Sequence, residues 1–335
     1  MTQSRSGYLP DRTVHLHPLA RCNLACKHCY SHSNPQASDM LSMRVLAPAL
    51  TQLREEGYEV LSLSGGEPML YPELEDLTRH AKALGFRVVA ISNGFRMNAK
   101  FAPLIDTFDG LAISFDGLEK VHNKVRCNPR AYDMALKGLA YLADSGKPVA
   151  AAYTVSKESL RDIPEFVEIA ADLGARAVQL RPLVMAGRAS DDYADYALNK
   201  ADRHRLWLIG QALGAAYDGE IAIHTDLAHA DDIYANRDAF AAVLNGCAPQ
   251  LSDLVNPLVI TPQGQMLPYT YDFPKEYALG HISDIADRNT AGIKAAAPKL
   301  RRLLHSVFDD IRTQDDFIDW FAHTRDFARG ATLTV

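Results

Sequence analysis

The sequence lacks several features that mark common classes of protein. It has only five cysteines, and an odd number excludes a framework in which every cysteine is disulfide-bonded within the chain. It has no run of about eighteen apolar residues, so it contains no indication of a membrane span. No apolar run follows the opening residues MTQSRSGYLPDR, so a secretory signal is not indicated either. These absences predict a cytoplasmic protein in a reducing compartment.

The chain also lacks an excess of positive charge. With 35 Lys and Arg against 41 Asp and Glu, the net charge is -6 and the isoelectric point is about 6.0. This balance argues against a nucleic-acid binder that works by neutralising phosphates. Internal repeats and low-complexity tracts are absent, and 47% hydrophobic residues suffice for a substantial core. We therefore expect a globular protein without a nucleic-acid or membrane partner.

Three of the five cysteines are crowded into one short stretch. Cys22, Cys26 and Cys29 lie within RCNLACKHCY, residues 21–30. Thiolates are the ligands of iron-sulfur clusters, and three of them hold three irons of a [4Fe-4S] cluster, which leaves the fourth iron open for a ligand that is not protein. The alternative is a zinc site, because structural zinc takes four nitrogen or sulfur ligands. The histidines that could complete it are His15, His17, His28 and His32.

Short apolar runs alternate with segments of helical periodicity from residue 13 to residue 182. The predicted strands are Thr13–Pro18, Val60–Leu63, Arg87–Ile91, Leu111–Ser114, Val149–Val155 and Ala177–Pro182. The predicted helices between them span 41–57, 72–84, 99–108, 131–145 and 163–173. Strands that are apolar on both sides indicate a parallel sheet covered by helices, with a functional site at the carboxyl ends of the strands. Residues 1–190 are therefore expected to form one catalytic unit.

The remaining chain follows a looser pattern. Residues 191–245 begin with an acidic segment and are expected to be a helical connector. Residues 246–335 form a further region with a predicted hairpin across Leu258–Pro268, where two apolar runs flank a P-x-G turn. Helices are expected from Thr290 to Asp309 and from Gln314 to Phe327.

Small and polar residues follow the second and third predicted strands. Gly65 and Gly66 allow the backbone to approach a ligand closely, and the Glu67 carboxylate can receive an ammonium group. The alternative is a strand-to-helix turn with an acid that caps the helix. After the third strand, Ser92 and Asn93 precede a glycine, and Asn-Gly by itself is typical of a turn.

The fourth and sixth strands carry further polar side chains. The run Ser114-Phe115-Asp116-Gly117 is followed by His122 and Arg126, although Asp-Gly alone indicates a turn. Gln179 and Arg181 face the site if alternate residues of the sixth strand do, and a structural ion pair is the alternative role for Arg181.

Together these motifs resemble those of the radical S-adenosylmethionine (radical SAM) enzymes. The C-x3-C-x2-C loop with a ring before its last cysteine, the GGEP segment, the polar pair at residues 92–93 and the S-x-D-G…H-x-x-x-R run are all similar to that family, and the last to its peptide-modifying branch. The implied site residues are Cys22, Cys26 and Cys29 for one [4Fe-4S] cluster, and His28, Gly65, Gly66, Glu67, Ser92, Asn93, Ser114 and Arg126 for S-adenosylmethionine.

The resemblance assigns a role to each of these groups. In the family, the segment matching Gly65–Glu67 contacts the amino group of the methionine moiety, and Ser92 and Asn93 match the polar pair that meets the ribose. A hydroxyl and a guanidinium suit a carboxylate, so Ser114 and Arg126 are the candidates for the methionine carboxylate.

The C-terminal region resembles the SPASM or twitch extension of the same superfamily. It departs from that pattern because Tyr269 stands where a cysteine is expected and only Cys247 is available. One thiol cannot hold an auxiliary cluster, so a single cluster is expected. The implied fold is α/β, a partial (β/α)6 TIM-like barrel with a small C-terminal α+β twitch-like extension.

The function implied by the resemblance is reductive cleavage of S-adenosylmethionine and abstraction of a substrate hydrogen by the 5′-deoxyadenosyl radical. The implied substrate is a peptide, modified by epimerisation or cross-linking, and the implied partner is a one-electron reductant such as a flavodoxin or ferredoxin. The short segment before residue 13 leaves little room for a leader-binding domain, so a small metabolite such as a sugar or aminoglycoside is an alternative. An alternative of another class is a non-catalytic zinc or redox protein.

Cys247 supports a more specific hypothesis. A thiol S–H bond is weak enough to donate a hydrogen atom to a carbon radical, as a cysteine does in radical SAM epimerases. Cys247 is therefore the candidate hydrogen donor for a redox-neutral epimerisation, and Cys127 is the reserve candidate. The alternative is that Cys247 is a small buried hydrophobic residue.

Overall fold

The chain forms a curved, mostly parallel sheet inside a layer of helices. A computed structural model describes residues 11–332. Nine strands form one sheet in the order β10-β9-β1-β2-β3-β4-β5-β6-β7, and the seven strands from β1 to β7 run parallel to their neighbours. They are β1 Thr13–Leu16, β2 Val60–Leu63, β3 Arg87–Ser92, β4 Gly110–Phe115, β5 Val149–Val155, β6 Ala177–Pro182 and β7 Ala222–Thr225. The expected α/β class and partial barrel are confirmed.

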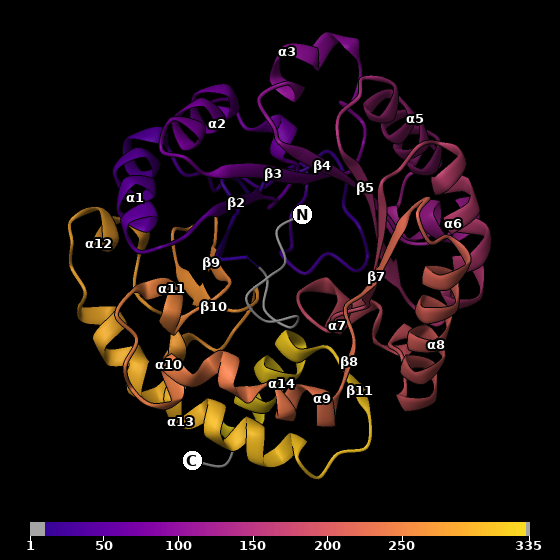
Figure 1. Ribbon diagram of the computed structural model, residues 1–335. Coiled ribbons are helices and arrows are strands. Elements are labelled where there is room, and N and C mark those ends of the chain that lie inside the picture. The colour runs from indigo at the N-terminus through magenta and orange to yellow at the C-terminus, as the bar shows by residue number, and fades with distance from the viewer. Residues whose placement is uncertain (1–10, 333–335) are drawn as a thin grey trace.

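Helices cover the outer face of this sheet, as Figure 1 shows. The helices that follow the parallel strands are α1 Met43–Glu55, α2 Leu74–Ala83, α3 Ala102–Ile105, α4 Glu119–Arg126, α5 Ala131–Asp144, α6 Ile163–Asp172, α7 Arg188–Asp192 and α8 Lys200–Ala216. Helix α1 illustrates the reason for this layer, because Leu46, Ala49, Leu50 and Leu53 recur on one face and are fully buried. Helix α3 is shorter than predicted, since a 3₁₀ turn precedes it at Ala99–Phe101.

Alternation along the strands separates the outer face from the barrel interior. In β6, Val178 and Leu180 are fully buried against the helices, while Gln179 is half-buried and Arg181 is exposed. The register places Ser114 beside Ala152, and Ala152 beside Gln179, so these inward positions lie at one level of the barrel. The inward side chains near the carboxyl ends are therefore the ones that can form a site.

The predicted hairpin is confirmed, but it extends the main sheet. Strand β9, Leu258–Ile260, pairs parallel to β1, and β10, Met266–Pro268, pairs antiparallel to β9. At the other edge, β7 is a seventh parallel strand within the segment expected to be a helical connector. The sequence pattern missed β7 because this strand has only four residues and none of them is fully buried.

The C-terminal helices occupy the sector between the two edges of the sheet (Figure 1). Helix α14 begins at Trp320, later than predicted, because Phe317–Ile318 forms β11 and pairs with β8, Ala228–His229. The other helices here are α9 Ala230–Ala235, α10 Ala241–Leu244, α11 Leu251–Leu254, α12 Ile282–Ala286, α13 Ala291–Ile311 and α14 Trp320–Thr332. Within residues 11–332, no helix has the length and apolar character needed to cross a membrane.

Candidate active site

The three clustered cysteines lie in the loop that leaves the carboxyl end of β1. All three are free thiols with partial exposure. Burial and then the nearby Glu67 raise the pKa of Cys22 to about 11. Burial also raises the pKa of Cys26 to about 12, against the opposing effect of Arg126, with smaller contributions from Cys22 and Cys29. Three soft sulfur donors close enough to influence one another fit an iron-sulfur group, whose cationic irons stabilise the thiolate form.

Hydrogen bonds from two helices hold this loop in place. The Lys27 amide donates to the Val125 carbonyl of α4 at 2.8 Å. Arg188 at the start of α7 donates from Nε to the Cys26 carbonyl and from Nη2 to the Ser33 carbonyl, both at 2.8 Å. The backbone of the loop is therefore pre-organised by two helices that are distant in sequence.

The two glycines after β2 make close contact with the cysteine loop. The Gly66 amide donates to the Leu19 carbonyl and the Glu67 amide to the Arg21 carbonyl, each at 2.9 Å. A Cβ added at Gly66 would lie 1.9 Å from the Arg21 carbonyl oxygen. Residue 66 must therefore be a glycine because the backbone of the cysteine loop packs against it. The sequence had suggested instead that close approach of a ligand requires the glycine.

We expect Gly66→Ala to destabilise the protein and to loosen the cysteine loop. The clash is with backbone, so the chain must shift, at a cost of roughly 1–3 kcal/mol, the range for overpacking. Urea unfolding measures the loss, and Gly214→Ala is the control because a Cβ there meets nothing within 4 Å. The control should be neutral or slightly stabilising, since alanine is favoured in helices. Equal stability of the two variants would contradict the assigned contact.

Glu67 joins the ends of β2 and β3. Its carboxylate is 2% exposed and accepts hydrogen bonds from Ser92 Oγ at 2.8 Å, the Asn93 amide at 2.9 Å and the Met69 amide at 3.2 Å. Burial raises the pKa of Glu67, while these three donors lower it. Glu67 also caps the 3₁₀ turn Pro68–Leu70, which confirms the capping alternative.

Ser92 and Asn93 have different environments. The Ser92 hydroxyl donates to Glu67 and accepts from the Gly94 amide at 3.1 Å, and its side chain shares the helix-facing side of β3 with Val88 and Ala90. The expected ribose contact of Ser92 stays a prediction that this arrangement disfavours, because the hydroxyl is already engaged with Glu67 and the Gly94 amide. Asn93 Nδ2 instead donates to Asn23 Oδ1 at 2.8 Å inside the cysteine loop.

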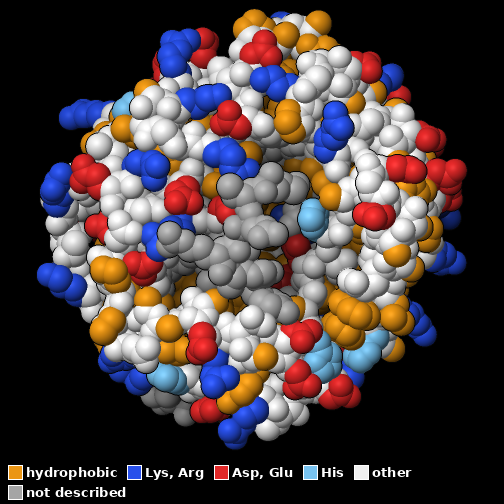
Figure 2. All heavy atoms as spheres, viewed as in Figure 1, with side chains coloured by type: hydrophobic (Ala, Val, Ile, Leu, Met, Phe, Trp, Pro, Cys, Tyr) orange, Lys and Arg blue, Asp and Glu red, His pale blue; other side chains and the backbone are white. Residues whose placement is uncertain are grey.

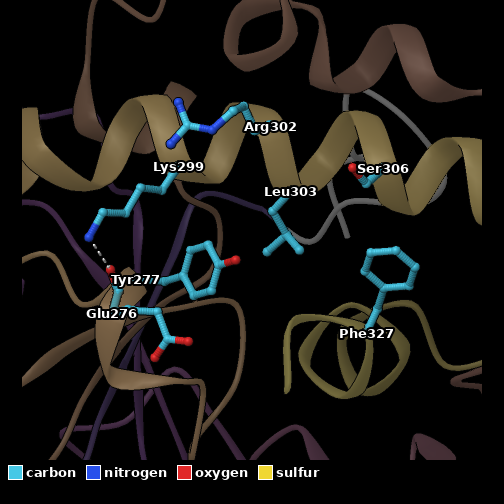
Figure 3. Close-up of a pocket in the computed structure, with 7 residues that line it drawn as sticks. All are labelled: Glu276, Tyr277, Lys299, Arg302, Leu303, Ser306 and Phe327. Carbon is cyan, nitrogen blue, oxygen red and sulfur yellow. Dashed lines mark hydrogen bonds between the residues drawn. The ribbon is translucent and has the colours of Figure 1, made fainter. Parts of the chain in front are cut away.

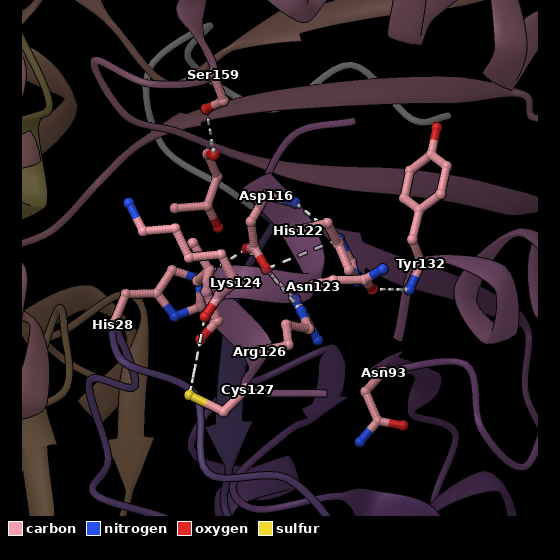
Figure 4. A network of polar contacts seen from close by, with 12 residues as sticks. His28, Asn93, Asp116, His122, Asn123, Lys124, Arg126, Cys127, Tyr132 and Ser159 are labelled. Carbon is pink, nitrogen blue, oxygen red and sulfur yellow. Dashed lines mark hydrogen bonds and ion pairs between the residues drawn. The ribbon is translucent and has the colours of Figure 1, made fainter. Parts of the chain in front are cut away.

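A buried charged network stands behind the loop, as Figure 4 shows. Asp116 is 2% exposed and accepts from Arg126 Nε at 2.6 Å, and its other oxygen is 2.7 Å from His28 Nε2. Although burial raises the pKa of Asp116, Arg126 and then His28 hold it well below its usual range. The loop residue His28 is thereby tied to the end of β4, and its Nδ1 is buried without a partner among residues 11–332. Arg126 gives Nε and Nη2 to Asp116, so only Nη1 is left for a ligand.

Cys247 is followed by a segment that lies at the amino edge of the sheet. It precedes Gln250 by three residues, and Gln250 Oε1 accepts from Arg12 Nη1 at 2.8 Å at the amino end of β1. The clustered cysteines leave the opposite end of β1. The hypothesis that Cys247 donates hydrogen stays a prediction that this neighbourhood disfavours, and the buried alternative is wrong because Cys247 is exposed. Cys127, also exposed, ends α4 at the edge that carries the cysteine loop.

Two histidines proposed for a zinc site have other partners. His17 Nε2 lies 3.1 Å from Ser64 Oγ and its ring stacks on Tyr271, while His28 is paired with Asp116. In residues 11–332, no three His, Cys, Asp or Glu side chains converge on the position of a single metal ion, whereas the three thiolates of a [4Fe-4S] cluster each bind a different iron. A surface pocket of about 320 Å³ lies between α13, α14 and the turn at Lys275–Tyr277 (Figure 3), and the loops at the carboxyl ends of the parallel strands do not line it.

Sequence reasoning missed several residues that shape the site. Asn23 and Arg188 contact or hold the cysteine loop, and Asp226 follows β7 and binds Gln179 and Arg181. The position of Asn23 between two cysteines could have identified it. Arg188 and Asp226 carry no local signal, because their partners are distant in sequence.

Comparisons with known proteins agree with this arrangement. The model of the radical SAM superfamily matches residues 16–170. The chain is 30% identical over 173 residues to the Fe-coproporphyrin III synthase of Methanosarcina barkeri, covering 51% of this chain and 43% of that protein. It is 24% identical over 266 residues to the antilisterial bacteriocin subtilosin biosynthesis protein AlbA of Bacillus subtilis, covering 78% of this chain and 55% of that protein.

The fold also resembles solved structures. Streptococcus suis SuiB bound to precursor peptide SuiA superposes with a TM-score of 0.68 at 14% identity, covering 88% of this chain and 67% of that chain. At this identity the likeness concerns the fold. The chain spans about half the length of the curated relatives it matches.

Proposed function

We propose that the chain, whose residues 16–170 match the model of the radical SAM superfamily, is a radical SAM enzyme that binds one [4Fe-4S] cluster through Cys22, Cys26 and Cys29 together with S-adenosylmethionine. The observation that carries this proposal is the position of the three thiols at the carboxyl edge of the parallel sheet, beside the ends of β2, β3 and β4. When bound, the cluster supplies one electron for cleavage of the sulfonium, and the resulting 5′-deoxyadenosyl radical abstracts a substrate hydrogen.

The described residues hold and shape this site. Arg188 and the His28–Asp116 pair hold the cysteine loop, while Glu67 fixes the turn that presents Asn93. We assign the contact with the methionine amino group to Gly65–Glu67 and the ribose contact to Asn93. Ser114, which faces the interior, and Nη1 of Arg126 are assigned to the methionine carboxylate.

We further propose that the substrate is a peptide, modified by cross-linking or epimerisation. This is supported by the similarity to AlbA over 78% of this chain and by the fold shared with SuiB, whose structure contains a precursor peptide. If the reaction is an epimerisation, Cys127 is the thiol at the correct edge. The similarity to a synthase of Fe-coproporphyrin III keeps a small-molecule substrate as the alternative. The working location is the cytoplasm, with a flavodoxin or ferredoxin as reductant.

We expect anaerobic reconstitution to give about four irons and four sulfides per chain, the content of one [4Fe-4S] cluster. The reason is that the two remaining cysteines, Cys127 and Cys247, lie at separate positions and cannot form a second set of ligands. Iron and sulfide analysis and the absorption spectrum measure the content, and protein incubated with zinc alone is the control. A reproducible value near eight irons would contradict the single cluster, and a stoichiometric zinc content without iron uptake would contradict the proposed function.

A further inference from the structure

The interior wall opposite the assigned S-adenosylmethionine contacts carries polar side chains to which the proposed function gives no role. They come from β1, the cysteine loop, β6, the end of β7 and the start of α14. We call them the β6–α14 group; its members are His15, Tyr30, Gln179, Arg181, Asp226 and Asp319. Figure 2 shows acidic side chains and a histidine beside the central hollow of the face seen in Figure 1.

Arg181 is held in one orientation with part of its guanidinium unpaired. Its Nε donates to Asp226 Oδ2 at 2.9 Å, and Gln179 Nε2 donates to both oxygens of Asp226 at 2.9 and 3.2 Å. The side chain is 44% exposed, and neither Nη1 nor Nη2 has a partner in the described part of the chain. The terminal edge of the guanidinium is therefore ordered before any ligand arrives, and this edge matches the two oxygens of a carboxylate.

Asp319 presents an unpaired group of the opposite sign. Its Oδ1 accepts from the amides of Phe321 and Ala322 at 3.0 and 3.1 Å, while Oδ2 accepts no hydrogen bond from residues 11–332. Burial and then the charge of Asp226 raise the pKa of Asp319 to about 6, so it is mainly ionised at pH 7.5. Burial lowers the pKa of His15 to about 4, so His15 adds no positive charge. One guanidinium thus pairs with Asp226 and lies near enough to Asp319 for their charges to interact, and within the group one negative charge is uncompensated.

We propose that the β6–α14 group is the substrate-recognition site and that it binds a zwitterionic substrate, with the carboxylate on Arg181 and an ammonium group on Asp319. A carboxylate alone would meet the uncompensated charge of Asp319, and an ammonium alone would leave the free edge of Arg181 without a partner. A ligand with both charges satisfies both groups. This inference rests on the proposed function and adds the chemical class of its substrate.

The position of the group favours the substrate over S-adenosylmethionine, which also carries both charges. The assigned S-adenosylmethionine contacts lie on the ends of β2, β3 and β4, whereas this group comes from β1, β6, β7 and α14. Burial lowers the pKa of Arg181. The charges of Asp226, Asp319 and then Tyr30 raise it, so these side chains share one environment with Arg181. Tyr30 directly follows the cluster ligand Cys29, so a ligand here lies next to the cysteine loop.

The test is a saturation-transfer NMR titration of the reconstituted protein with defined probes. The peptide Ac-Lys-Gly-Glu-NH2 carries both charges, while Ac-Lys-Gly-Gln-NH2 and Ac-Nle-Gly-Glu-NH2 each carry one. The small-molecule arm uses 6-aminohexanoate with hexanoate and hexylamine. We expect the doubly charged probe of at least one arm to bind about tenfold more tightly than its singly charged analogues, and the arm that binds more tightly identifies a peptide or a small amino acid as the source.

Variants assign the binding to the two residues. Arg181→Gln and Asp319→Asn should each weaken the doubly charged probe about tenfold, and Asn retains the oxygen that caps α14. Arg87→Gln is the matched control, since Arg87 forms an ion pair with Asp11 at the amino end of β3. Thermal unfolding of each variant shows whether it is folded. Arg181→Lys keeps the positive charge but removes the two parallel N–H donors of the guanidinium, so it tests the paired hydrogen bonds separately from the charge.

The inference is overturned if neither doubly charged probe binds, if singly charged analogues bind equally well, if folded variants bind like the parent, or if S-adenosylmethionine displaces the probe. The same parent preparation is assayed for S-adenosylmethionine cleavage under dithionite. Cleavage without probe binding rejects this inference alone, and probe binding without cleavage rejects the proposed function alone.

Discussion

Replacing Cys26 by alanine is expected to reduce the formation of 5′-deoxyadenosine under dithionite to background. Two thiols remain in the loop, and a cluster that needs three protein ligands loses one of them. Because Cys26 is only partly buried and its carbonyl, not its side chain, receives the hydrogen bond of Arg188, the fold should be retained. Chromatographic assay of 5′-deoxyadenosine together with iron content measures the effect.

Cys247→Ala is the matched control for this experiment. It removes an exposed thiol near the amino ends of the strands and should leave both iron content and cleavage at the parent level. Cleavage by Cys26→Ala at the parent rate would reject the assignment of the cluster ligands. A loss of cleavage in Cys247→Ala would instead reject the placement of Cys247 outside the site.

Asp116→Asn is expected to cause the largest loss of stability among single polar substitutions in the site. The substitution keeps the shape of the side chain but leaves the buried guanidinium of Arg126, 6% exposed, without its counter-charge. Removal of one partner from a buried pair costs about 3–5 kcal/mol. His28 would also lose its charged partner, so the cysteine loop should become more accessible. Urea unfolding of the cluster-free protein measures the stability.

The control for Asp116→Asn is Asp133→Asn, which breaks an exposed ion pair with Lys137 and should cost less than about 1 kcal/mol. A similar effect of the two substitutions would show that the buried network does not stabilise the fold. The pH dependence has a defined sign. Because the folded-state pKa of Asp116 is lowered, its contribution is present above the unfolded pKa of about 3.9 and is lost as the pH falls through the folded-state value.

Local sequence patterns were sufficient to predict most of the α/β framework. Alternating strands and helices from residue 13 to 182 and the hairpin at 258–268 were recognised because their signals, apolar periodicity and turn residues, are local. The short strand β7 and the displaced start of α14 were missed, because β7 and β11 depend on pairing with β6 and β8. Pairing between distant segments leaves little trace in a single sequence.

The sequence by itself determined the chemistry that is available: three thiols at C-x3-C-x2-C spacing, and polar residues after three successive strands. Tertiary structure decided which of these side chains lie together at the site. Strand alternation turned Ser92 toward Glu67 and left Asn93 beside the cysteine loop, and chain direction placed the segment that follows Cys247 at the opposite edge. Likewise, Arg181 meets Asp226 and Asp319 only after β7 and α14 have assembled against β6. The physical reason is that hydrogen bonds and ion pairs act over a few ångströms in space, and the partners of these groups lie tens to hundreds of residues away along the chain.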